Sequence, residues 1–121
     1  MSDITVVLVH GAFADGSGWA GVIVALAGKG LTVVAPPNPL RGIAADAAYI
    51  ASFLQQITGP VLLVGHSYGG AVITNAASQV DNVVGLVYVD AFMPDQSETL
   101  QALADQATDS LILPALRPVQ Y

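Results

Sequence analysis

A serine inside a glycine-rich turn is the residue of this sequence best suited to covalent chemistry. Residues 65–69 read Gly-His-Ser-Tyr-Gly, which is the G-x-S-x-G spacing of a nucleophile elbow centred on Ser67. An apolar run at 61–64 precedes the motif and small residues follow it, so the strand–turn–helix context that an elbow needs is present. In that sharp turn the serine backbone is strained, and side chains at 65 and 69 would collide. The alternative is a glycine-rich turn in which the serine only caps the next helix.

Two backbone amides must also point at the oxyanion that forms when such a serine attacks a carbonyl group. One normally belongs to the residue after the nucleophile, here Tyr68, and the other to a loop after an earlier strand. Ala12 lies just past the apolar run at 4–9, and the carboxyl ends of parallel strands meet at one edge of a sheet. We therefore predict that the amides of Ala12 and Tyr68 form an oxyanion hole.

The serine further needs a base, usually a histidine that a carboxylate orients. The sequence has two histidines, His10 and His66. The side chain of His66 should diverge from that of its neighbour Ser67, and His10 lies at a strand end, where its ring is expected to brace the loop by hydrogen bonds. Asp90 ends a predicted strand and is a candidate acid, although an aspartate there often only caps the following loop. The nucleophile therefore lacks an evident base.

Several large side chains near these loops could line an apolar pocket for an acyl group. They are Phe13, Trp19, Phe92 and Met93. Each could equally be an ordinary core residue, and this alternative is strongest for Trp19.

Nucleotide and metal sites are disfavoured. Residues 16–21 match G-x-G-x-x-G, but they begin well beyond the first strand, and the second strand ends in Ala-Pro-Pro without an acid for a ribose. Two histidines, no cysteine and scattered carboxylates show no metal-ligand spacing. We predict neither a cofactor nor a metal.

Composition narrows the class of partner. The chain has 121 residues, of which 54% are hydrophobic and 10% charged, which suits one folded domain. A net charge of −6 disfavours nucleic acids and anionic membranes as partners. The N-terminus lacks the basic region of a signal peptide, and no stretch is long enough to span a bilayer. We expect a cytoplasmic protein with a small-molecule substrate.

Short apolar runs that alternate with helical patterns predict an α/β fold. The predicted strands are 4–9, 31–35, 61–64 and 83–89, and the predicted helices are 17–26, 43–57, 67–78 and 96–107. Ser17 is expected to cap the first helix, whose packed side should carry Trp19, Val22, Ile23 and Leu26. Right-handed crossovers between about four strands give a doubly wound parallel sheet with helices on both faces.

Three ordered segments, strand–HGAF…W, strand–GHSYGGAV and strand–VDAFMPD, resemble the α/β-hydrolase superfamily. They are most similar to the small esterases related to plant methyl esterases and hydroxynitrile lyases. The resemblance implies that Ser67 is the nucleophile and that Ala12 and Tyr68 supply the oxyanion amides. It also implies a hydrolase core over residues 1–94 and the beginning of a helical cap over 95–121. Gly11 matches the esterase pattern, whereas hydroxynitrile lyases of this group carry threonine there, which disfavours cyanohydrin chemistry.

The sequence departs from that family at its end. Such folds run Ser…Asp/Glu…His along the chain, with the histidine after the last strand. The resemblance therefore implies that these residues form the N-terminal half of a domain and that the triad histidine and usual acid lie outside it. We expect a carboxylesterase-type serine hydrolase for a small, largely apolar ester, associated with the missing C-terminal half or with itself through an exposed sheet edge. The alternatives are a non-catalytic hydrolase-fold protein for ligand binding or interaction, and an inactive fragment.

Overall fold

The structure is a computed structural model that describes residues 4–12 and 14–91. Its strands are β1 (Thr5–Val9), β2 (Thr32–Val34), β3 (Val61–Ser67) and β4 (Val83–Ala91). Its helices are α1 (Ala20–Ala27), α2 (Ile43–Gln55) and α3 (Tyr68–Ala77), and a 3₁₀ turn, η1 (Gly16–Trp19), precedes α1. The predictions for Phe13, Phe92, Met93 and the cap region 95–121 lie outside the described residues.

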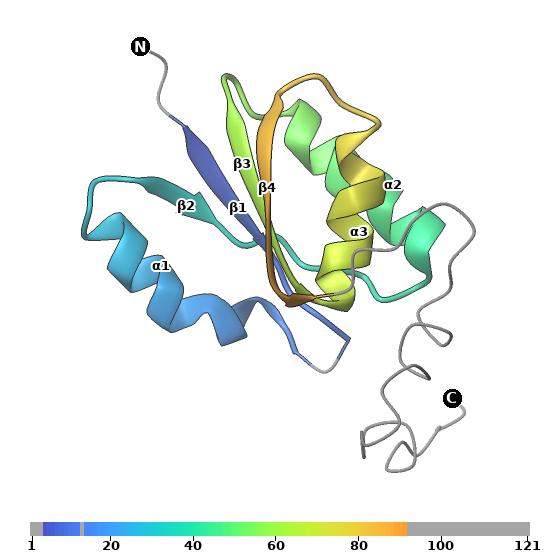
Figure 1. Cartoon of the computed structure of the whole chain (residues 1–121), viewed down its shortest axis with the longest axis horizontal. Helices are drawn as coiled ribbons and strands as arrows, with labels where there is room; N and C mark the ends of the chain where they lie inside the picture. Colours follow the sequence, from blue (N-terminus) through green and yellow to red (C-terminus); the bar gives the residue numbers. More distant parts are fainter. Residues whose placement is uncertain (1–3, 13, 92–121) are drawn as a thin grey trace.

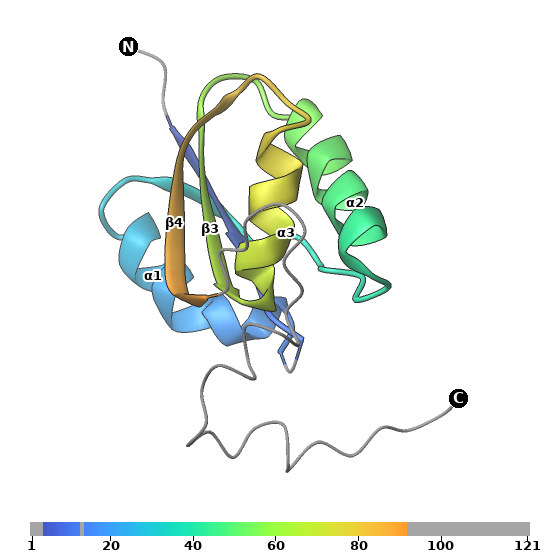
Figure 2. The same ribbon diagram turned by 45° about the vertical axis from the view of Figure 1, so that its right-hand side comes forward.

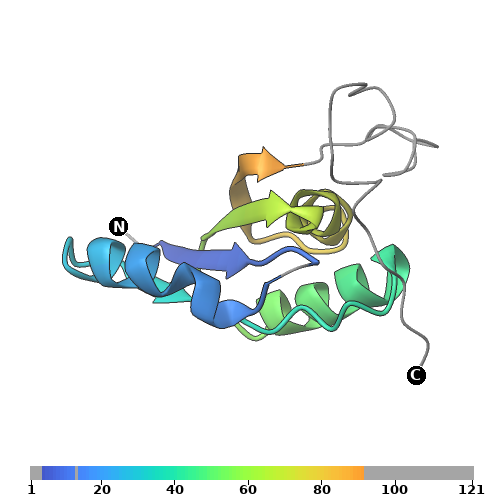
Figure 3. The same cartoon turned by 90° about the horizontal axis from the view of Figure 1, so that it is seen from below.

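In the described part of the chain, four strands form one parallel sheet in the order β2-β1-β3-β4 (Figure 1). The arrowheads of β1, β3 and β4 point the same way when the molecule is seen from below (Figure 3). The chain moves outward from β1 to β2 and then crosses to β3 on the other side of β1. Ligands of doubly wound sheets bind beyond the carboxyl ends of the strands at such a reversal of order. The predicted doubly wound parallel sheet is confirmed.

Successive side chains of β1 point to opposite faces of the sheet, and the interior therefore has two apolar layers. Val7 and Val9 face α2 and α3 and belong to a buried cluster with Ile50, Leu54, Leu63, Val72 and Ile73. Val6 and Leu8 face the opposite side and pack with Trp19 and Val64, against which Ile23 and Leu26 of α1 lie. Helix α1 therefore covers one face of the sheet, and α2 and α3 lie side by side on the other (Figures 1 and 2). The prediction of helices on both faces is confirmed.

The beginning of the first helix differs from the prediction. Asp15, not Ser17, is the capping residue: its carboxylate accepts hydrogen bonds from the backbone N–H of Ser17, at 2.9 Å, and from the Ser17 hydroxyl. These bonds hold the pKa of Asp15 below its ordinary value. They close the 3₁₀ turn η1, and α1 begins at Ala20. Trp19, Ile23 and Leu26 pack as predicted. Val22, predicted to be packed, is 40% exposed.

Two strands are longer than predicted at their carboxyl ends. Strand β3 continues through His66 to Ser67, and β4 continues to Ala91, because the ladder between them extends to the pairs His66–Val89 and Ser67–Ala91. The serine of the elbow is thus the last residue of a strand, and the first residue of α3 follows it directly. None of the helices described has both the length and the apolar character needed to cross a bilayer.

Candidate active site

The backbone of Ser67 is strained in the manner that a nucleophile elbow requires. Its φ of 56° and ψ of −124° are unfavourable for a residue with a Cβ atom. The side chain makes no capping hydrogen bond to α3. The alternative in which the serine serves only as a helix cap is therefore not supported, because the hydroxyl does not do what a cap does.

Glycine is required on both sides of the serine because the chain passes very close to itself there. A Cβ atom at Gly65 would lie 2.6 Å from the carbonyl oxygen of Gly69. A Cβ atom at Gly69 would collide with the backbone carbonyl of Val9 in β1. The predicted need for glycine at 65 and 69 is confirmed. The second contact also shows that the first turn of α3 sits directly against the end of β1.

The loop after β1 runs beside the serine hydroxyl. A Cβ atom at Gly11 would lie 3.0 Å from the Ser67 Cβ and 3.5 Å from the Ser67 Oγ. The next residue, Ala12, shares a pocket of about 260 Å³ with Tyr68, Leu40 and Gly42. The two residues predicted to supply the oxyanion amides thus border one pocket at the carboxyl ends of β1 and β3.

The ring of His10 is fully engaged in holding loops together. The backbone N–H of Asn38 donates to Nε2 at 2.9 Å, and since that nitrogen accepts, Nδ1 carries the proton and donates to the Gly11 carbonyl at 2.8 Å. The side-chain amide of Asn38 donates to the His10 carbonyl at 3.0 Å. The prediction that this ring braces the loop is confirmed. Neither ring nitrogen is free to accept the proton of a serine.

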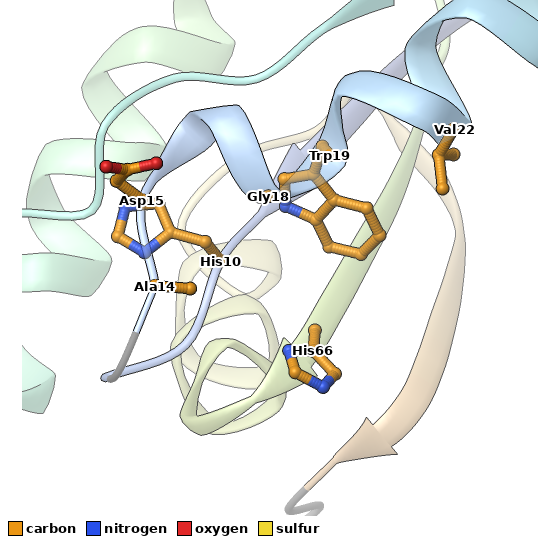
Figure 4. A pocket seen from close by; sticks show the side chains of 7 residues that line it. All are labelled: His10, Ala14, Asp15, Gly18, Trp19, Val22 and His66. Atoms are coloured by element: carbon orange, nitrogen blue, oxygen red, sulfur yellow. The ribbon is translucent and has the colours of Figure 1, made fainter.

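The other histidine lies on the opposite face of the sheet from α2 and α3. His66 is exposed and its ring meets that of Trp19 edge to face, with centroids 6.3 Å apart and an interplanar angle of 83°. The two rings help to line a pocket of about 230 Å³ together with His10, Asp15 and Val22 (Figure 4). Trp19 is also 92% buried against Val6, Leu8 and Val64, which supports the core interpretation of this residue. Its contact with a substrate stays a prediction.

We expect His10→Ala to destabilise the protein by about 2–4 kcal/mol, because it leaves the Asn38 N–H and the Gly11 carbonyl buried without their partners. His66→Ala is the matched control, since its ring is exposed and loses only one aromatic contact, worth up to about 1 kcal/mol. Urea unfolding followed by far-ultraviolet circular dichroism measures both. Equal losses for the two variants would contradict the assignment of His10 as a brace.

A buried carboxylate that the sequence did not single out lies behind the elbow. Asp46 of α2 is fully buried; its Oδ2 accepts a hydrogen bond from the Tyr68 hydroxyl at 2.6 Å, and its Oδ1 accepts one from the Arg41 N–H at 2.9 Å. Burial first, and then the bond to Asp46 and its negative charge, raise the pKa of Tyr68 above its ordinary value. The only signal in the sequence was an aspartate within the otherwise apolar face of a predicted helix.

Asp90, the candidate acid, occupies an irregular position near the end of β4. The ladder pairs His66 with Val89 and Ser67 with Ala91, so Asp90 is the extra residue of a β-bulge, and its φ is 42°. Its carboxylate is exposed and has no hydrogen-bond partner among the described residues. The bulge places Asp90 beside the strand end that carries Ser67, and its catalytic role stays a prediction.

Comparison with known proteins decides the family. A sequence model of the alpha/beta hydrolase family matches residues 6–120. The chain belongs to this family. It is 33% identical over 114 residues to a carbendazim hydrolyzing esterase from Nocardioides sp. (strain SG-4G), covering 84% of this chain and 47% of that protein. The resemblance inferred from the three sequence segments is thereby confirmed at the level of the superfamily.

Solved structures agree with this membership. An extracellular alpha/beta-hydrolase from a Paenibacillus species, described as sharing structural and functional homology with tobacco salicylic acid binding protein 2, superposes with a TM-score of 0.71 at 26% identity, over 84% of this chain and 49% of that one. A pyrethroid hydrolase from Sphingobium faniae JZ-2 superposes with a TM-score of 0.62 at 29% identity, over 74% and 40%. The chain spans about half the length of the relatives it matches.

Proposed function

We propose that the protein is a serine hydrolase of the carboxylesterase type, with Ser67 as its nucleophile and a small, largely apolar ester as its substrate. The observation that carries the proposal is the strained serine between β3 and α3, whose hydroxyl does not cap the helix and lies beside the loop after β1. The relatives named as a carbendazim hydrolyzing esterase and a pyrethroid hydrolase support hydrolysis as the reaction class.

The arrangement suits a two-step acyl transfer. The Ser67 oxygen attacks the ester carbonyl carbon while a base takes the hydroxyl proton, and the backbone amides of Ala12 and Tyr68 hold the resulting oxyanion. Collapse of the tetrahedral intermediate expels the alcohol, which takes the proton back. Water then repeats the attack on the acyl-enzyme, and the carboxylic acid leaves with Ser67 regenerated.

The base is the component that these residues do not supply. The nitrogens of His10 are both engaged, and His66 is turned toward Trp19. We assign the base to polypeptide other than these 121 residues, and the orienting acid either to Asp90 or to that same polypeptide. This other polypeptide would pack beside β4, the last strand described, where the side chains of Val84, Val87 and Val89 are exposed. A second copy of this chain bound there is the competing arrangement.

Labelling with a fluorophosphonate probe tests the proposal. The native protein, including any chain that follows Tyr121 in the cell, should be labelled at Ser67, as located by mass spectrometry of the peptides. The 121-residue chain alone should label at least about 1,000-fold more slowly, since loss of triad members leaves only the oxyanion hole and binding. Rapid labelling of the short chain would overturn the assignment of the base, and labelling elsewhere would overturn that of the nucleophile.

A second function, ligand binding without catalysis, is favoured by one observation: both ring nitrogens of His10 are hydrogen-bonded, and the ring of His66 packs against Trp19. In that case the native protein would bind small apolar esters reversibly and would not react with the probe. The same labelling experiment separates the two functions.

A further inference from the structure

Two segments with unfavourable backbone angles border the pocket that Ala12 and Tyr68 share. One is the elbow, with Ser67 at a φ of 56°. The other is the loop before α2, where Leu40 has a φ of 60° and Gly42 a φ of 134°. Leu40 and Gly42 line that pocket with Tyr68. A non-glycine residue in such a conformation costs of order 1–3 kcal/mol and persists only where surrounding contacts hold it.

Both segments donate hydrogen bonds to the same carboxylate. The Arg41 N–H, between Leu40 and Gly42, donates to one oxygen of Asp46, and the hydroxyl of Tyr68, directly after Ser67, donates to the other. Asp46 is fully buried, so neither bond competes with water. Hydrogen bonds to a carboxylate are stronger than bonds between neutral groups.

We propose that Asp46 is a positioning residue, which holds the elbow and the 40–42 loop in the geometry needed for acyl transfer by binding Tyr68 and Arg41 through its two oxygens. Tyr68 is the residue whose backbone amide is assigned to the oxyanion, so anchoring its side chain limits the rotation of that amide. The inference rests on the proposed function for its catalytic consequence but not for the contacts themselves.

The two bonds of Asp46 can be removed separately. Tyr68→Phe removes the hydroxyl alone. Asp46→Asn keeps one oxygen for the Arg41 N–H and replaces the charged acceptor of the Tyr68 hydroxyl by an NH₂ group, which can offer only a weaker, neutral bond in the opposite direction. Asp46→Ala removes both acceptors. Tyr49→Phe is the matched control, because Tyr49 lies on the same helix and is exposed.

The catalytic effect is measured by fluorophosphonate labelling of the native protein. The labelling kinetics give two quantities, the affinity of the reversible complex and the rate of the covalent step. Tyr68→Phe and Asp46→Asn should each slow the covalent step about tenfold and change reversible affinity by less than about twofold, as expected for contacts that act on the transition state. The variant that carries both Tyr68→Phe and Asp46→Asn should be no slower than either single variant, since both lose the same hydrogen bond from the Tyr68 hydroxyl to a charged carboxylate. Tyr49→Phe should react at the parental rate.

Hydrogen exchange of the Arg41 amide supplies a readout that is independent of activity. Its protection should persist in Tyr68→Phe and Asp46→Asn and fall in Asp46→Ala. Parental labelling rates in Tyr68→Phe and Asp46→Asn, or rates that multiply in the double variant, would overturn the proposal. If the parent protein is not labelled at all, the proposed function fails, while the exchange data still decide whether Asp46 holds the loop.

Discussion

Replacing Ser67 by glycine should abolish the proposed esterase activity and at the same time make the protein more stable. The backbone at Ser67, with φ 56° and ψ −124°, is accessible to glycine and unfavourable for every residue with a Cβ atom. Release of that strain is worth of order 1–3 kcal/mol, and the extra freedom of glycine in the unfolded chain offsets part of it. We therefore expect the free energy of unfolding to increase by about 1 kcal/mol.

Ser67→Ala is the matched variant, because it removes the same hydroxyl but keeps the Cβ atom and therefore the strain. Both variants should lose at least about 1,000-fold in turnover of a p-nitrophenyl ester by the native protein. Only the glycine variant should show a raised urea midpoint. A glycine variant less stable than the alanine variant would mean that the observed backbone angles store no strain.

Features that depend on a few neighbouring residues could be predicted from the sequence. The elbow is of this kind, since Gly65, Ser67 and Gly69 are close in sequence and their steric conflict is local. The role of His10 was also predictable, because a ring at the end of a strand is within reach of the adjoining loop. The alternation of apolar runs with helical patterns was sufficient to predict the parallel sheet and the helices on both of its faces.

Features that depend on how elements pack could not be predicted. Asp46 and Tyr68 are 22 residues apart, and they meet only because α2 and α3 lie side by side on one face of the sheet. Apolar character alone predicts that the third and fourth strands end at residues 64 and 89. Pairing between β3 and β4 extends both strands further, to Ser67 and Ala91. The prediction of Ser17 as the cap is wrong because the extended residue before the 3₁₀ turn is Asp15, with φ −140° and ψ −176°, and composition does not determine such backbone angles.

Replacing Gly69 by alanine should destabilise the protein more than adding a methyl group at any other glycine of the site. The new Cβ atom would meet the carbonyl of Val9, which is backbone in the central strand β1 and has no side-chain freedom with which to yield. Helix α3 would have to move away from β1. We expect the free energy of unfolding to fall by at least about 3 kcal/mol and Ser67 labelling to be lost.

Gly21→Ala in α1 is the control: its Cβ atom would meet nothing within 4 Å, and alanine there should stabilise the helix by up to about 1 kcal/mol. Urea unfolding of both variants measures the difference, and a Gly69 variant of parental stability would show that α3 does not approach β1 as closely as the structure has it.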